Sequence, residues 1–245
     1  MTTYTPDQRN SGSLQSSFQP AQSWPGTDLA LRSFMLRVFN TMAGGLAVTG
    51  VVAYTAATSG LYAAIAGTPL LWVVMLAPVG LALLLSFGIE RMSPAAAQLA
   101  FWSYAALMGV SLAGIFLIYT GTSVARVFFI SAGAFAATAA WGYTTRTDLS
   151  RFGSFLFMGL IGIVLASVVN LFLGSTAVQF AVSVIGVLVF TGLTAYDTQR
   201  LKEMYASRWD DDGRSRTAIM GALMLYLDFI NLFMSLLQLF GTRRD

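Results

Sequence analysis

One apolar stretch near the C-terminal end, residues 223–241 (LMLYLDFINLFMSLLQLFG), most constrains what this chain can fold into. About 20 apolar residues in a helix span the roughly 30 Å hydrocarbon core of a bilayer. The stretch carries one acid near its middle, Asp228. A carboxylate at that depth costs at least about 2.5 kcal/mol on insertion scales, so it must face protein or water. We therefore expect this helix to lie inside a bundle.

The polar residues of this helix repeat with a helical spacing. Asn231, Ser235 and Gln238 follow Asp228 at offsets of 3, 7 and 10 residues, which places all four on one face. The other positions are mostly Leu, Phe, Met and Ile. We predict that this helix is the most enclosed of the bundle. Asn231, Ser235 and Gln238 are candidates for lining a hydrophilic path.

The composition predicts an all-α, polytopic membrane protein. Of the 245 residues, 56% are hydrophobic and only 10% are charged. The basic residues are dispersed along the chain, so a nucleic-acid partner is not expected. The chain has neither Cys nor His, which excludes thiol chemistry and the usual proton switch near neutral pH. No nucleophile–base pair is recognisable, so we expect neither an enzyme nor a cofactor.

Seven segments are long and apolar enough to span a membrane. Residues 1–30 are rich in Ser, Thr, Gln and Pro and are expected to form a disordered cytoplasmic tail, which leaves 31–245 as the membrane domain. The long connection 200–217 is hydrophilic, and its acidic run 210–212 is expected to be a solvated loop. The expected spans are 35–57, 70–90, 98–119, 124–143, 155–174, 177–199 and 218–240.

The basic residues indicate the orientation. With the N-terminus in the cytoplasm, 11 of the 14 Lys and Arg residues fall on the cytoplasmic side. Seven full crossings then place the C-terminus outside. The pair Arg243 and Arg244 would instead favour a re-entrant last helix. The length of the last apolar stretch favours a full crossing.

An internal repeat is a hypothesis from the first and fourth spans. Residues 37–55 (RVFNTMAGGLAVTGVVAYT) resemble 126–144 (RVFFISAGAFAATAAWGYT) at an offset of 89. The first and fourth spans cross the membrane in opposite directions. The match would therefore indicate an inverted repeat of two three-helix halves. The alternative is a chance likeness between two helices rich in Ala and Gly.

A second acid, Asp197, ends the sixth span in GLTAYDTQR. On one interpretation it is a headgroup-layer residue that shares solvent with Arg200. On the other, it meets Asp228 inside the bundle, where burial and mutual repulsion favour one shared proton and so a pH switch without histidine. Arg91, at the end of the second span, is either a topology anchor or a counter-ion to one of these acids.

AYDTQ in the sixth span and LYLDFINLF in the seventh resemble the Bax inhibitor-1 family of seven-helix membrane proteins. The resemblance covers residues 30–241 and implies a central seventh helix wrapped by two three-helix layers. It also implies a pH-sensitive calcium leak whose two acids, here Asp197 and Asp228, share a proton when closed and bind calcium transiently. The family's latch arginine falls on Arg91. The short tail and compact loops resemble bacterial members, which implies the plasma (inner) membrane.

Two classes of function remain open from the sequence. The first is a passive calcium pathway gated by the acid pair, with the lipid bilayer and calcium ions as partners and calcium homeostasis as its role. The second is an interaction protein that modulates a membrane partner, such as a quality-control protease, through the tail and the 200–217 connection.

Overall fold

The computed structural model describes residues 25–206 and 210–244. The expected tail therefore lies outside the described residues over 1–24. Its last part, residues 25–30, forms the first turns of helix α1 (Pro25–Thr58). Ala30 and Leu31 pack against the hydrophobic core, which explains why the helix extends beyond the expected start of the first span.

Seven of the described helices are long and apolar enough to cross a membrane, as expected. The all-α, polytopic fold is confirmed. The third crossing is broken at Ala113 and Gly114, so α4 is followed by the single turn α5. The elements after α1 are α2 (Leu61–Ala66), α3 (Leu70–Gly88), the 3₁₀ turn η1 (Ile89–Arg91), α4 (Pro94–Leu112), α5 (Ile115–Ile118), α6 (Gly121–Thr144), α7 (Ser150–Leu173), α8 (Thr176–Ala206) and α9 (Asp211–Phe240).

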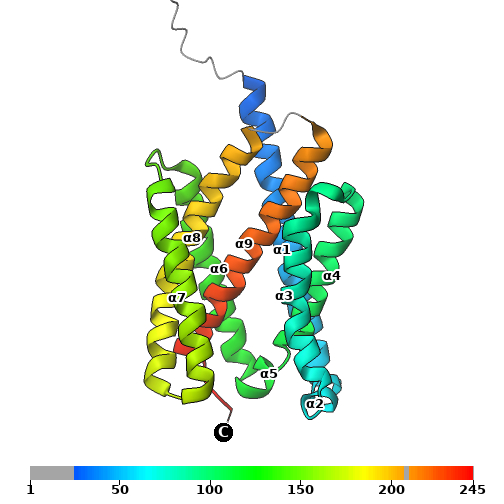
Figure 1. Ribbon diagram of the computed structural model, residues 1–245, viewed down its shortest axis with the longest axis vertical. Helices are drawn as coiled ribbons and strands as arrows, with labels where there is room; N and C mark the ends of the chain where they lie inside the picture. Colours follow the sequence, from blue (N-terminus) through cyan, green and yellow to red (C-terminus); the bar gives the residue numbers. More distant parts are fainter. Residues whose placement is uncertain (1–24, 207–209, 245) are drawn as a thin grey trace, which may run out of the picture.

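Helix α9 passes diagonally between two groups of helices, α1, α3 and α4 on one side and α6, α7 and α8 on the other (Figure 1). In its apolar window, 72% of the residues are buried inside the bundle, compared with 33% or less in the other six spans. The prediction that the last helix is the most enclosed is confirmed. The core is built on it, with Leu225, Tyr226, Leu232 and Leu237 almost fully buried.

The hydrophilic connection between the last two spans is mostly helical, contrary to the expected loop over 200–217. Helix α8 continues to Ala206, and α9 begins at Asp211. The acidic run has a structural role there, because the Asp210 side chain accepts a hydrogen bond from the Gly213 N–H at 2.7 Å and caps α9. Asp211 and Asp212 follow in the first turn, where acids interact favourably with the helix dipole.

The C-terminal end lies opposite the start of α1 (Figure 1). Helix α9 runs for 30 residues, so the structure favours the full crossing over the re-entrant alternative. Beyond the helix, the Thr120 N–H donates to the Thr242 carbonyl at 3.0 Å and the Arg244 N–H donates to the Ile118 carbonyl at 2.9 Å. These bonds fasten the far end of α9 to the α5–α6 connection.

The two helices of the hypothetical repeat occupy matching places. Helix α1 packs against α9 and α4, and α6 packs against α9 and α8. Each therefore contacts both the central helix and the third long helix of its own half. This arrangement fits two related halves around α9.

Candidate functional site

Asp197 and Asp228 meet between α8 and α9. The two helices run antiparallel, and the carboxyl groups lie within side-chain hydrogen-bonding reach of each other. Asp228 is only 5% exposed, and Asp197 is partly buried. The close approach is possible because a glycine, Gly186, faces the side chain of Ser235 farther along the same helix pair. Of the two sequence interpretations of Asp197, the structure therefore favours the inward one.

Two carboxyl groups form a hydrogen bond only when one of them carries a proton, because an ionised carboxylate has acceptors alone. The Asp228 Oδ2 atom is buried and has no hydrogen-bond partner among the described residues. An ionised acid in that position would lack the donors that offset the loss of water. The two carboxyl groups are thus close enough for one proton to be shared between them.

A cavity of about 480 Å³ opens beside the pair, between α7, α8 and α9. It combines apolar walls with polar groups, and both acids contribute to its lining. Its lining residues are Gly153, Ser154, Phe157, Leu160, Phe190, Leu193, Tyr196, Asp197, Arg200, Met224, Leu227, Asp228 and Asn231. The acid pair is therefore in contact with a space large enough for several water molecules.

The cation beside this pair is Arg200, one turn beyond Asp197 on α8. Its charge acts favourably on the Asp197 carboxylate, and its side chain lines the cavity. Arg91 lies elsewhere, exposed at the end of η1, and is not among the cavity-lining residues. The counter-ion role of Arg91 stays a prediction. Asp197 and Arg200 are three residues apart, a spacing that places them on the same face of a helix. The sequence therefore already contained a signal that these two residues are neighbours.

The polar residues that follow Asp228 on α9, namely Asn231, Ser235 and Gln238, differ in their surroundings. The Asn231 side chain lines the cavity and donates to the Leu227 carbonyl at 2.8 Å. Ser235 is buried and donates to the Asn231 carbonyl. Gln238 accepts a hydrogen bond from the Ser183 hydroxyl of α8 at 2.7 Å. These contacts join α8 to α9. Asn231 lines the cavity together with Asp228, whereas Ser235 and Gln238 are not among its lining residues. A pore-lining role for Asn231, Ser235 and Gln238 stays a prediction.

A second polar group lies on the other side of α9, and sequence reasoning did not find it. The Thr49 hydroxyl of α1 and the Tyr226 hydroxyl are 2.6 Å apart, and Thr49 also lies 2.8 Å from the Ala105 carbonyl of α4. The ring of Tyr104 packs edge-on against Tyr226, with centroids 5.4 Å apart. The Tyr104 hydroxyl is buried without a hydrogen-bond partner among the described residues. Nothing in the local sequence marks these residues, because they come from three separate helices.

Comparison with known proteins decides the family. The family model described as an inhibitor of apoptosis-promoting Bax1 matches residues 31–245, which is nearly all of the chain. The chain belongs to the Bax inhibitor-1 family. The resemblance carried by the two aspartate motifs is confirmed, and the match spans all seven membrane helices.

Relatives of this Bax inhibitor-1 family member come from several bacteria. An uncharacterised protein of Rickettsia prowazekii is 48% identical and covers 89% of this chain and 93% of its own. Inner membrane protein YbhL of Escherichia coli is 45% identical, and the match covers 87% of this chain and 93% of YbhL. An uncharacterised membrane protein of Streptococcus pyogenes is 34% identical, and the match covers 88% of this chain and 95% of that protein. With its seven apolar helices, the chain fits a bacterial inner membrane, as expected.

Proposed function

We propose that this protein is a pH-sensitive calcium leak of the inner membrane, gated by Asp197 and Asp228. The observation that carries the proposal is the approach of the two carboxyl groups within the membrane bundle, beside a cavity that both of them line. While one proton is shared, the carboxyl groups hold α8 and α9 together. When the proton leaves, two anions face each other in a poorly solvated place.

The energy available to such a switch is sufficient. Two unit charges roughly 4 Å apart repel by about 4 kcal/mol at an effective dielectric constant of 20. A difference of about 1.4 kcal/mol already changes the ratio of two populations tenfold. Loss of the proton is therefore enough to part α8 from α9 at the level of the acid pair. A rise in pH opens the path, and a fall in pH closes it.

Calcium is the ion that suits these groups, because it prefers oxygen ligands and accepts irregular geometry. Two carboxylates supply fewer oxygens than the six to eight that a tightly held calcium ion takes. The described part of the chain holds no group of three or more acidic side chains that could retain a metal. A calcium ion would thus bind transiently at Asp197 and Asp228 on its way through, which is what a leak requires.

The decisive experiment uses pure protein in liposomes loaded with a calcium-sensitive dye, from about pH 6 to pH 8. Wild-type protein should leak more calcium as the pH rises. Asp228→Asn and Asp197→Asn should each blunt that pH dependence, because each removes one titrating group and keeps a hydrogen-bonding side chain. Ala at either position should also remove the hydrogen bond and favour the parted state.

An unchanged pH profile in both Asn variants would show that these acids are not the sensor. No calcium flux from correctly inserted wild-type protein would overturn the leak itself. That result would leave interaction with a membrane partner, such as a quality-control protease, as the function to pursue.

A further inference from the structure

A second cavity lies at the end of the bundle where α1 begins, α8 ends and α9 begins (Figure 1). Its volume is about 440 Å³, and its lining is mostly polar. Arg37 of α1 and Arg214 and Ser215 of α9 form its walls, and the buried rings of Phe34 and Tyr205 lie beneath them. By the distribution of basic residues, this is the cytoplasmic end of the protein.

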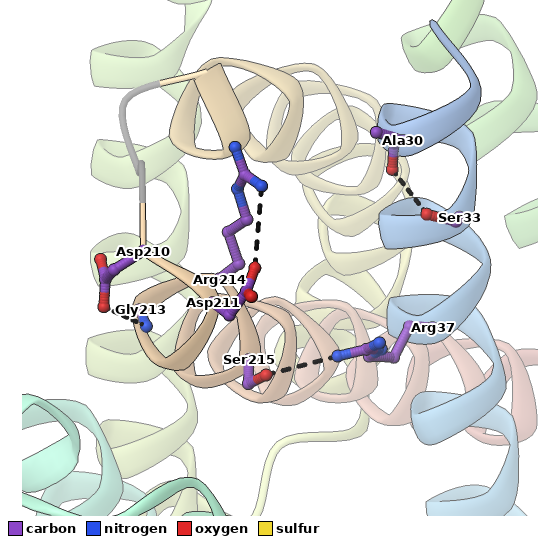
Figure 2. A network of polar contacts seen from close by, with 8 residues as sticks. All are labelled: Ala30, Ser33, Arg37, Asp210, Asp211, Gly213, Arg214 and Ser215. Carbon is purple, nitrogen blue, oxygen red and sulfur yellow. Dashed lines mark hydrogen bonds and ion pairs between the residues drawn. The ribbon is translucent and has the colours of Figure 1, made fainter. Parts of the chain in front are cut away.

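The two arginines enter this cavity from different helices, as Figure 2 shows. Arg37 reaches across from α1 and donates to the Ser215 hydroxyl at 3.3 Å. The Arg214 guanidinium lies over the Tyr205 ring, 5.1 Å from its centre. That stacking orients the planar guanidinium group, and the Ser215 hydroxyl that accepts from Arg37 is neutral.

The one carboxylate in this lining, that of Asp211, offsets the positive charge of the cavity only in part. Asp211 approaches Arg214 at 3.9 Å, beyond hydrogen-bonding distance, and its side chain is fully exposed to solvent. Such exposed ion pairs contribute little. Asp210 is directed to the α9 N-terminus and lies 3.8 Å from Arg216. The cavity is thus lined by two guanidinium groups and one carboxylate, and that carboxylate points outward.

We propose that this cavity, lined by Arg37 and Arg214, is a binding site for a phosphate group. Guanidinium groups bind phosphate oxygens through paired, charge-assisted hydrogen bonds. The Ser215 hydroxyl of the lining accepts from Arg37 and keeps its own proton, so it adds one further donor. A phosphate held by both arginines joins the start of α1 to the start of α9, the helix that carries Asp228. The inference is independent of calcium flux, because its readout is binding.

The phosphate could belong to an anionic lipid or to a soluble compound. Leu36, which precedes Arg37 on α1, is 51% exposed, so apolar surface is available to an acyl chain on this part of α1. Basic sites between helices on the cytoplasmic side of membrane proteins bind anionic headgroups in this manner. The two sources share one recognition chemistry, and separate probes distinguish them.

The test measures binding to the full chain in a neutral detergent by titration calorimetry. The probes are short-chain phosphatidylglycerol, short-chain phosphatidylcholine and inorganic phosphate. We expect phosphatidylglycerol to bind, and Arg37→Gln and Arg214→Gln to weaken it by about fivefold each. Arg151→Gln is the matched control, because Arg151 is an exposed arginine in the first turn of α7 and does not line the cavity. It should bind like wild type, and phosphatidylcholine should bind more weakly.

Asp211→Asn distinguishes a specific loss of binding from a loss caused by misfolding. Removal of this carboxylate should tighten binding by about twofold to fivefold, a gain that a damaged protein would not give. Arginine-dependent binding of inorganic phosphate would identify a soluble ligand, and arginine-dependent binding of phosphatidylglycerol alone would identify a lipid headgroup. The site does not exist if neither anionic probe binds. Equal affinities in wild type, Arg37→Gln and Arg214→Gln, or an equal loss in Arg151→Gln, would also overturn it.

Discussion

Gly142 of α6 lies directly against the backbone of Ala195 of α8, where a Cβ atom on Gly142 would come within 2.8 Å of the Ala195 Cα. The contact is between backbones, so no side-chain rotation can relieve it. It fixes the distance between α6 and α8 two residues before Asp197. Close packing at small residues is the usual way in which membrane helices associate.

We predict that Gly142→Ala destabilises the protein by about 1–3 kcal/mol, because the added methyl group forces α6 away from α8. Gly133→Ala is the matched control on the same helix, since a Cβ atom there meets nothing within 4 Å. The control should gain about 0.5–1 kcal/mol from the better helix propensity of Ala. Thermal unfolding followed by tryptophan fluorescence in detergent measures both. Equal unfolding temperatures in the two variants would contradict the close contact.

A second prediction concerns the cation beside the acid pair. Arg200→Gln removes a positive charge that favours the ionised form of Asp197, so the shared proton should persist to higher pH. We therefore expect the pH midpoint of calcium flux in liposomes to move upward. Arg200→Lys keeps the positive charge, so its pH midpoint should lie between those of Arg200→Gln and wild type.

Arg91→Gln in the same assay separates the two arginines. If Arg91 acts as the latch that the family resemblance implies, its loss should change the flux or its midpoint, and Arg91→Lys should be milder. If Arg91→Gln matches wild type while Arg200→Gln shifts the midpoint, Arg200 is the working counter-ion. An unchanged pH midpoint in Arg200→Gln would show that Arg200 does not take part in the pH response.

A third prediction concerns Asp148, in the connection between α6 and α7 and outside the membrane spans. The Ser150 N–H donates to its Oδ1 atom at 2.9 Å, and this bond lowers the pKa of the Asp148 carboxyl below its usual range. A carboxyl whose pKa is lowered by folding adds stability above its unfolded pKa of about 3.9. That stability is lost as the pH falls through the folded pKa.

Asp148→Asn keeps the hydrogen-bond acceptor and removes the charge. We expect its unfolding temperature to lie slightly below that of wild type at pH 7, and the difference to shrink as the pH falls toward 3. The effect should be small because the side chain is fully exposed. Unfolding temperatures of the two proteins at both pH values measure it. A difference of equal size at pH 3 and pH 7 would assign it to something other than the charge.

The sequence determined the features that depend on local pattern. Runs of about twenty apolar residues located the seven spans, because each crossing must satisfy its own backbone hydrogen bonds in lipid. The one acid in the middle of the last run identified α9 as the enclosed helix, because Asp228 could not face lipid. The hydrophilic character of 200–217 was read correctly, but not its helical structure, which depends on the Asp210 cap and on packing against α1.

The tertiary structure decided which residues meet across helices. Asp197 reaches Asp228 because Gly186 and other small residues set the distance and register of α8 and α9. Arg200 lies beside Asp197 because the two are three residues apart on α8, whereas Arg91 is exposed at the end of η1. Arg37 reaches Ser215 across 178 positions of sequence. Hydropathy specifies which side of a helix is buried, but not its rotation or height against a neighbour. Those depend on the fit of side chains over the whole bundle.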